Sequence, residues 1–376
     1  MTTSDFQRRP RARIVRLAAA AAAVVVASMV VAACGSGSSS TSESTSAAGS
    51  SHAPIKVTLI LKDLSNPYWI FMRNAAKAEA AKLGVSLKVF AGQTDSDTTT
   101  QINAIEDAIS AGDSGIIVVS NGNAVNSAIQ KARSAGIAVY ALDTVPIPAS
   151  SVDMTFATDN TEAGRLIGKW AAAKLHGAKA DIALLDDVTT EVVEVDVDRN
   201  HGFLEGMGIS PGKQDVNGTE AKSGHYTGGQ GGSYTIACQL PTGGSQSGGQ
   251  SAMETCLSKD PNINVVYAIN EPAAEGAVRA LKTADKHGVT VVAIDGACST
   301  LPFIKSGEIG ATAGQFPGTM AKLGIAAVVK DIHTGVKPKP SHGLDFFDTG
   351  TKLYTNSPQH GVQSVSAAHA KTLCWG

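Results

Sequence analysis

Short apolar runs alternate with segments of helical periodicity from residue 55 onward. The runs KVTLIL (56–61), SLKVFAG (86–92), GIIVVS (115–120) and AVYALD (138–143) are strand-like, and each is followed by a segment with helical periodicity. Alternation at this spacing is typical of crossover units with parallel strands. The pattern begins again with NVVYAIN (264–270) and VTVVAID (289–295). We therefore expect an α/β fold with two lobes and not one large sheet.

Composition limits the classes of partner. The chain has 376 residues, of which 43% are hydrophobic, so it can bury a sizeable core. Its formal net charge of -2 gives no electrostatic footprint for nucleic acid, which we exclude as a partner. No Cys or His spacing resembles a zinc site, and we expect neither a metal nor a cofactor.

Residues 1–33 are interpreted as a signal peptide, because arginines precede the apolar run LAAAAAAVVVASMVVAAC (17–34). The string VAAC followed by Gly35 resembles a bacterial lipobox. We therefore expect Cys34 to be acylated and to anchor the chain to the outer face of the cytoplasmic membrane. A retained transmembrane helix or a plain secreted chain is the alternative. The Ser- and Gly-rich residues 34–53 are expected to form a disordered tether.

Four further cysteines are expected to form disulfides, because an even number in an exported chain favours them. They are Cys238, Cys256, Cys298 and Cys374. Three connectivities are open, and we favour Cys238 with Cys256 and Cys298 with Cys374. The first pair flanks a segment so rich in Gly, Ser and Gln, 214–251, that we expect a long surface excursion partly held by the disulfide.

Ligands of open parallel sheets bind beyond the carboxyl ends of the strands, so residues at strand ends are candidates. The stretch LKDLSNPYW (61–69), where a strand ends and a helix begins, contributes an amide and two aromatic rings. The candidates read from all strand ends are Lys62, Asn66, Tyr68, Trp69, Ser120, Asp143, Thr144, Asn270, Asp295 and Gln315.

Carboxylates, amides and aromatic rings together suit a neutral polyhydroxylated ligand. The polar groups hydrogen-bond vicinal hydroxyls, while flat rings cover the C–H faces of a sugar. Each residue also has a structural interpretation: Asp143, Asn270 and Asp295 could cap helices, and Tyr68 and Trp69 could belong to a core. The ligand interpretation predicts that Trp69→Ala weakens binding at least about tenfold and leaves the ligand-free melting temperature within a few degrees.

Several motifs resemble those of periplasmic sugar-binding proteins of the ribose-binding type, and most of all the fructose-binding subgroup of ABC importer components. They are SNPYW (65–69), ALDT (141–144), FATDNTEAGRLIGKWAA (156–172), INEPAAEGA (269–277), AIDG (293–296), GATAGQFP (310–317) and CWG (374–376). The resemblance covers about residues 55–376, interrupted by the excursion at 214–251.

The resemblance implies the type I periplasmic binding protein fold, with two Rossmann-like lobes joined by a multi-strand hinge. The N-terminal lobe would comprise 54–158 with about 315–345, and the C-terminal lobe 159–314 with about 346–376. It also implies a monomer that closes on one sugar and presents it to a permease and its ATPase, or to a sensor kinase. Ribose-binding proteins carry Arg where this chain has Thr144, and Arg199 is the nearest candidate for their second-lobe arginine. A ketohexose such as fructose, or a polyol, therefore fits better than ribose.

Enzyme interpretations are weaker. The string GDSG (112–115) matches the nucleophile motif of trypsin-like proteases, but it lies in a parallel α/β pattern unlike that family's β-barrels. The acidic stretch DDVTTEVVEVDVD (186–198) could supply carboxylates for glycoside hydrolysis or calcium, but a strand end followed by a helix start explains it as well. We expect a binding protein and not an enzyme.

Overall fold

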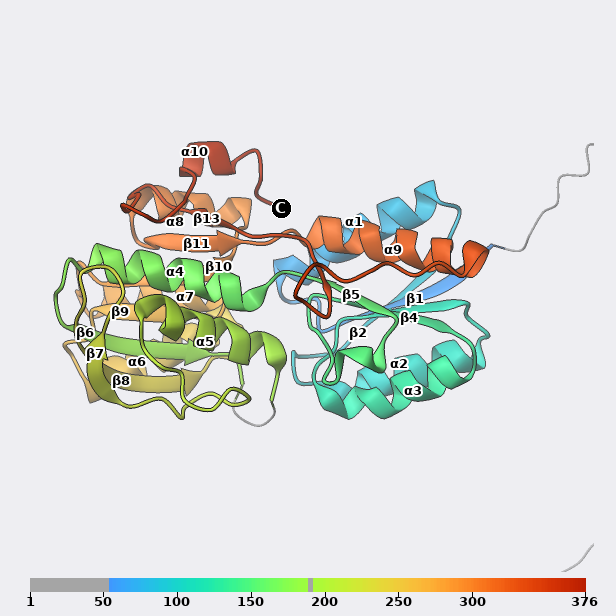
Figure 1. Cartoon of the computed structure of the whole chain (residues 1–376), viewed down its shortest axis with the longest axis horizontal. Coiled ribbons are helices and arrows are strands. Elements are labelled where there is room, and N and C mark those ends of the chain that lie inside the picture. Colours follow the sequence, from blue (N-terminus) through green and yellow to red (C-terminus); the bar gives the residue numbers. More distant parts are fainter. Residues whose placement is uncertain (1–53, 189–191) are drawn as a thin grey trace, which may run out of the picture. The chain divides into compact units, whose positions relative to one another are not determined.

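Two sheets, one per lobe, organise residues 54–188 and 192–376, which the computed structural model describes (Figure 1). The first sheet is entirely parallel. Its strands, in spatial order, are β12 (Phe347–Asp348), β5 (Met154–Ala157), β4 (Ala138–Leu142), β3 (Gly115–Val118), β1 (Lys56–Leu61) and β2 (Ser86–Ala91). Because helices cover both faces, the central β3 is buried throughout and β1 from its second residue on.

Two pairs of helices cover the first sheet. On one face lie α1 (Pro67–Lys82) and α9 (Pro317–Thr334), and on the other lie α2 (Thr98–Ser110) and α3 (Asn126–Ser134) (Figure 1). Short 3-10 turns η1 (Asn123–Val125) and η2 (Ala149–Ser151) lie in the loops. The order β2-β1-β3-β4-β5 is that of a doubly wound sheet, whose ligands bind beyond the carboxyl ends of the strands.

The second lobe repeats this order as β8-β6-β9-β10-β11, and its two edge strands are antiparallel. The strands, in spatial order, are β13 (Lys352–Tyr354), β11 (Ala311–Gly314), β10 (Thr290–Asp295), β9 (Val265–Ala268), β6 (Ala180–Asp186), β8 (Gly232–Pro241) and β7 (Ser223–Tyr226). One face packs on α4 (Asn160–Lys174) and α5 (Glu194–Met207). The other packs on α6 (Gln246–Lys259), α7 (Glu271–Thr283), α8 (Leu301–Ser306) and α10 (Ala367–Ala370), and the 3-10 turn η3 (Cys298–Thr300) directly precedes α8.

The chain crosses between the lobes three times. The crossings run from β5 to α4, from β11 to α9 and from β12 to β13. These segments make the multi-strand hinge that the resemblance implies, and the fold class is confirmed. The boundary expected near residue 346 needs a correction, because β12 at Phe347–Asp348 pairs with β5 in the first sheet. The ring of Phe347 packs against that of Phe156, 5.6 Å between centroids.

The glycine-rich segment 214–251 is more regular than expected. It forms the hairpin β7 and β8, and β8 pairs in parallel with β6 along most of its length. The expectation of a long surface excursion is wrong because the backbone groups of β8 extend the sheet next to β6, whatever the composition of the segment. Both favoured disulfides are confirmed: Cys238 with Cys256 joins β8 to α6, and Cys298 pairs with Cys374.

Predictions for the first 53 residues, including the signal peptide, acylated Cys34 and tether, lie outside the described residues. In the part that the structure describes, no helix combines the length and hydropathy needed to cross a bilayer.

Candidate functional site

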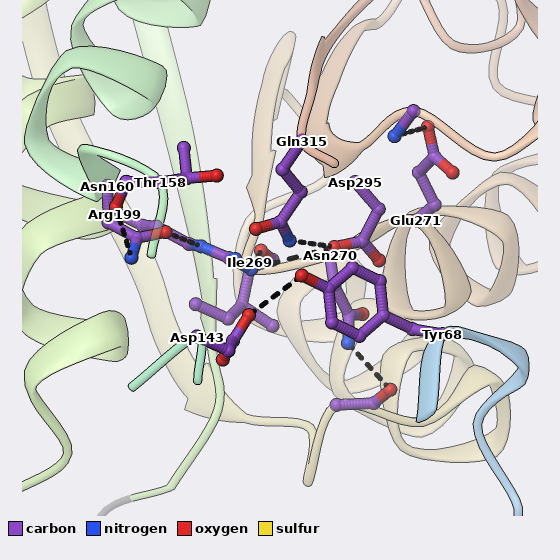
Figure 2. Close-up of polar contacts among 12 residues, drawn as sticks. Tyr68, Asp143, Thr158, Asn160, Arg199, Ile269, Asn270, Glu271, Asp295 and Gln315 are labelled. Atoms are coloured by element: carbon purple, nitrogen blue, oxygen red, sulfur yellow. Dashed lines mark hydrogen bonds and ion pairs between the residues drawn. The ribbon is translucent and has the colours of Figure 1, made fainter. Parts of the chain in front are cut away.

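One small cavity is lined by residues of both lobes, at the carboxyl ends of their strands. Its volume is about 30 Å³. The lining residues are Lys62, Asn66, Tyr68, Trp69, Asp95, Asp143, Asp187, Val195, Arg199, Ile269, Asn270, Asp295 and Gln315. Figure 2 shows several of them converging from different elements.

The start of α1 supplies an amide and two aromatic rings. Asn66 is the N-cap of α1, since its side-chain oxygen accepts a hydrogen bond from the backbone N–H of Tyr68, and Pro67 is the first helical residue. This cap fixes the direction of the first turn, so that Tyr68 and Trp69 line the cavity. Their rings meet edge to face, 4.7 Å between centroids. Both also belong to the apolar cluster of the first lobe and are 2% and 5% exposed.

Asp143 follows β4 and accepts hydrogen bonds on both carboxylate oxygens. Tyr68 Oη donates to Oδ1 at 2.9 Å (Figure 2), and Thr144 Oγ1 donates to Oδ2 at 3.1 Å. Burial, followed by the negative charge of Asp143, raises the pKa of the Tyr68 phenol well above its ordinary value. Tyr68 therefore stays a neutral donor throughout the physiological range.

Asp295 ends β10 and is the matching carboxylate of the second lobe. Gln315 Nε2, in the crossing from β11 to α9, donates to Asp295 Oδ1 at 2.8 Å (Figure 2). Arg199 Nη1 lies 3.8 Å from the same oxygen. Burial raises the pKa of Asp295 to about 8, and the positive charge of Arg199 only partly offsets it. The hinge segment thus contacts the site carboxylate directly.

Arg199 is buried on α5 and is held on two sides. Its Nε donates to Asn160 Oδ1 at 2.8 Å, and its Nη1 donates to the carbonyl of Ile269 at 3.0 Å (Figure 2). Asn160 is the first residue of α4, directly after a lobe crossing. The two helices approach closely because glycines face the partner backbone: a Cβ built on Gly164 would lie 2.3 Å from the carbonyl oxygen of Arg199.

Asn270 combines a structural role with its position at the cavity. Its side-chain oxygen accepts from the backbone N–H of Ala273, which makes it the N-cap of α7, and its Nδ2 donates to the carbonyl of Gly244 at 2.9 Å. The helix-cap interpretation is thus observed for Asn270. It does not apply to Asp143 or Asp295, which are not the caps of the helical turns that follow them.

Asp95 and Asp187 also line the cavity but were not predicted from the sequence. Asp95 lies in a polar loop after β2, and Asp187 belongs to an acidic stretch already explained as a strand end. Burial raises the pKa of both, well above the ordinary range in the case of Asp95, and Lys62 partly offsets this. Burial alone would lower the pKa of Lys62, but these two carboxylates outweigh it and the net shift is upward. The position of Asp187 one residue past β6 was the available signal.

Four buried polar atoms of cavity-lining residues have no hydrogen-bond partner within the described ranges. They are Asp95 Oδ1, Asp187 Oδ1, Gln315 Oε1 and Trp69 Nε1. Buried polar atoms are nearly always paired in native proteins, so each such atom calls for an explanation. A polar ligand bound between the lobes is one, because all four residues line the same cavity.

A family model described as periplasmic binding protein domain matches residues 57–332, well over half of the chain. This chain belongs to the periplasmic binding protein family. The ribose import binding protein of Salmonella typhimurium is 26% identical over 291 residues, covering 77% of this chain and 88% of that protein. The galactofuranose-binding protein of Escherichia coli is 28% identical over 277 residues, covering 71% and 78%. A crystal structure of the Caulobacter myo-inositol binding protein bound to myo-inositol superimposes with a TM-score of 0.67 at 22% identity, covering 80% of this chain and 93% of that one.

Membership of the periplasmic binding protein family makes the chain a binding protein and not an enzyme. Ser114 of the GDSG string precedes the buried strand β3, and its N–H donates to the carbonyl of Lys56 in a regular connection. In the part of the chain that the structure describes, no group of His, Cys, Asp and Glu side chains is placed to hold a metal ion.

All the predicted site residues of this periplasmic binding protein line the cavity except Ser120 and Thr144. The hydroxyl of Ser120 is hydrogen-bonded to the backbone carbonyl and N–H of Gly122. Thr144 does not line the cavity itself but donates a hydrogen bond to Asp143, which does. Val195, in the first turn of α5, and Ile269, directly after β9, line the cavity but were not predicted, because an apolar residue at such a position carries no signal of its own.

Proposed function

We propose that this protein is the lipid-anchored solute-binding component of an ABC importer, which captures a monosaccharide such as a fructose-like ketose and delivers it to a membrane permease. The observation that carries the proposal is the set of unpaired buried atoms on Asp95, Asp187, Gln315 and Trp69 around one cavity lined by both lobes. The resemblance to sugar-binding proteins supports it, and the lipid anchor rests on the sequence around Cys34.

A sugar satisfies this set because each hydroxyl both donates and accepts a hydrogen bond. Three of the four unpaired atoms are acceptors and the fourth, Trp69 Nε1, is a donor. The neighbouring rings of Tyr68 and Trp69 can cover the apolar face of a sugar ring. The similarity to proteins named for ribose, galactofuranose and myo-inositol supports the same chemistry. A polyol is the second candidate, favoured by the similarity to the myo-inositol binding protein.

The cavity must widen before a monosaccharide can enter. A volume of about 30 Å³ holds roughly two water molecules. Contacts between the lobes close it: the backbone N–H of Val145, in the first lobe, donates to Glu194 Oε2 of α5 at 3.0 Å. We propose that the lobes open about the three crossings, and that a sugar contacting both lobes favours closure by the difference in its affinity for the two states.

A thermal-shift screen of residues 54–376 tests the function. The protein is first dialysed free of carried-over ligand, and D-fructose, D-ribose, D-galactose, sorbitol and myo-inositol are added separately. A ligand at about 100 times its dissociation constant adds about 2.7 kcal/mol to the free energy of unfolding, which is several degrees. A selective rise with D-fructose supports the ketose proposal, and one with myo-inositol or sorbitol supports the polyol. No rise with any of them would overturn the ligand class.

Small-angle scattering tests the mechanism separately. If closure accompanies binding, a saturating ligand from the screen should lower the radius of gyration. Superimposable profiles with and without that ligand would rule out hinge closure while leaving the ligand assignment intact.

Import into vesicles that hold a permease and its ATPase would distinguish an importer component from a sensor that reports to a membrane kinase.

A further inference from the structure

Trp375 connects the two lobes although it belongs to neither sheet. Its backbone is joined to the end of β10: it forms a parallel bridge with Ala297, and its carbonyl accepts from the N–H of Cys298 at 2.8 Å. The preceding residue, Cys374, is disulfide-bonded to Cys298. The main chain of Trp375 is therefore fixed to the second lobe by hydrogen bonds and by a covalent link next to it.

The side chain of Trp375 packs on the first lobe. Its ring meets that of Tyr68 edge to face, 5.2 Å between centroids, and lies 5.8 Å from that of Phe71. It is only 6% exposed and belongs to the apolar cluster formed by α1, α9 and the first sheet. One residue anchored in the second lobe thus completes the core of the first.

Two of the contacts of Trp375 are with residues of the ligand cavity. Its indole Nε1 donates to the backbone carbonyl of Asp295 at 2.8 Å, and its ring supports Tyr68, whose hydroxyl donates to Asp143. Trp375 itself does not line that cavity; it lines a larger pocket of about 640 Å³ that shares Asn66, Asp95 and Asp295 with it. It can therefore act on a ligand only through its neighbours.

We infer that Trp375 is a positioning residue of the sugar site: it sets the spacing between Tyr68 of the first lobe and Asp295 of the second, and the Cys298–Cys374 disulfide holds it there. This inference rests on the proposed function for its ligand. A bound sugar contacts the sides of the cavity that carry Tyr68 and Asp295. If the indole of Trp375 packs less firmly, these two residues can move apart and the affinity for the sugar falls. The same loosening makes the ligand-free protein open more readily.

The test compares Trp375→Phe and Trp375→Ala with a matched control, Trp170→Phe. Trp170 is also buried and also donates its indole N–H to a backbone carbonyl, that of Ser357, at 2.8 Å, but it lines neither pocket. D-fructose is titrated by calorimetry, with myo-inositol in parallel. We expect Trp375→Phe to lose about fivefold in affinity, as for one hydrogen bond, Trp375→Ala to lose more than tenfold, and Trp170→Phe to stay within about twofold. Equal losses in Trp375→Phe and Trp170→Phe, or none in either, would overturn the inference.

Small-angle scattering of the ligand-free variants tests the positioning role without any ligand. If neither D-fructose nor myo-inositol binds the wild type, that result contradicts the proposed ligand class only, and the scattering result still decides the role of Trp375. We expect a larger radius of gyration for Trp375→Ala than for wild type and Trp170→Phe; equal radii would overturn the positioning role. The double variant Cys298→Ser/Cys374→Ser should match Trp375→Ala, whereas Cys238→Ser/Cys256→Ser should keep the wild-type radius. If both double variants keep that radius, the disulfide does not hold Trp375 in place.

Discussion

Asp143 and Asp295 have backbone conformations that few residues other than glycine adopt. Their φ angles are 65° and 152°; Asp143 directly follows β4, and Asp295 is the last residue of β10. Such conformations cost on the order of 1–3 kcal/mol and persist only where the surroundings fix them. Here both turn the chain at a strand end while the side chain lines the cavity. This backbone strain supports a functional role for the two acids over the helix-cap interpretation.

Trp69 belongs to the cavity and to the core of the first lobe at once, which alters the prediction made from the sequence. Trp69→Ala should still weaken sugar binding at least about tenfold, because it removes a ring and the unpaired Nε1. It should also lower the ligand-free melting temperature by several degrees, since truncating a buried aromatic costs about 3–5 kcal/mol. Calorimetric titration and thermal unfolding measure the two effects.

Trp69→Phe is the control for this prediction. It keeps an aromatic ring against Tyr68 but removes the indole N–H, so most of the stability should return while part of the affinity stays lost. Trp69→Ala with lowered stability and unchanged sugar affinity would show that Trp69 serves the core alone.

At the scale of elements, the pair α4 and α5 positions Arg199. Glycines of both helices contact the partner backbone: a Cβ built on Gly164 would lie 2.3 Å from the carbonyl oxygen of Arg199, and one built on Gly168 would lie 2.2 Å from that of Phe203. No side chain fits at either position without moving α5. Because Arg199 faces Asp295 and Ile269, a shift of α5 moves a charged group of the site.

Gly164→Ala and Gly168→Ala therefore form a matched pair. Both should lower the free energy of unfolding by about 1–3 kcal/mol, as overpacking does. Gly164→Ala should also weaken sugar binding several-fold, because its methyl group displaces the turn that carries Arg199. Gly168→Ala acts one turn further along and should affect binding less. Chemical denaturation and sugar titration of the two variants check this, and equal losses of affinity would show that Arg199 is not displaced selectively.

The elements also show what the sequence can predict. Strands such as β1, β3, β4 and β9 carry continuous apolar runs, so their ends, and with them Lys62, Asp143 and Asn270, could be located. Strand β8 was missed because its stability comes from hydrogen bonds to β6, which composition does not encode. Asp95 was missed for a related reason: only folding brings its loop to the cavity.

At the scale of the whole molecule, buried carboxylates couple stability to pH. Burial raises the pKa of Asp186 and Asp198 to about 6 and that of Asp295 to about 8. It also raises the pKa of several other acids of both lobes, among them Asp95, Glu194 and Asp196. In the unfolded chain all of these groups lose their protons near pH 4.

The folded protein consequently binds more protons than the unfolded chain between about pH 4 and pH 8, so its free energy of unfolding falls as the pH rises through this range. His201 has the opposite effect, because burial lowers its pKa and its contribution to the free energy of unfolding is lost as the pH falls. The buried carboxylates outnumber it, so their effect on stability is larger. We expect the ligand-free protein to melt at least about 5 °C higher at pH 5 than at pH 8.

Asp295→Asn provides the control, because an amide of the same shape cannot titrate. The variant should lose the share of one proton across about pH 4 to pH 8, which reduces the slope between pH 6 and pH 8, while Asp186 and Asp198 keep their contribution below about pH 6. Calorimetric melting at closely spaced pH values distinguishes the two contributions. A sugar whose hydroxyls donate to Asp295 favours the carboxylate form, so binding near pH 7 should release protons in the wild type and fewer in the variant. A wild-type melting temperature that is flat or rises from pH 5 to pH 8 would mean that these carboxylates are ionised in the folded protein.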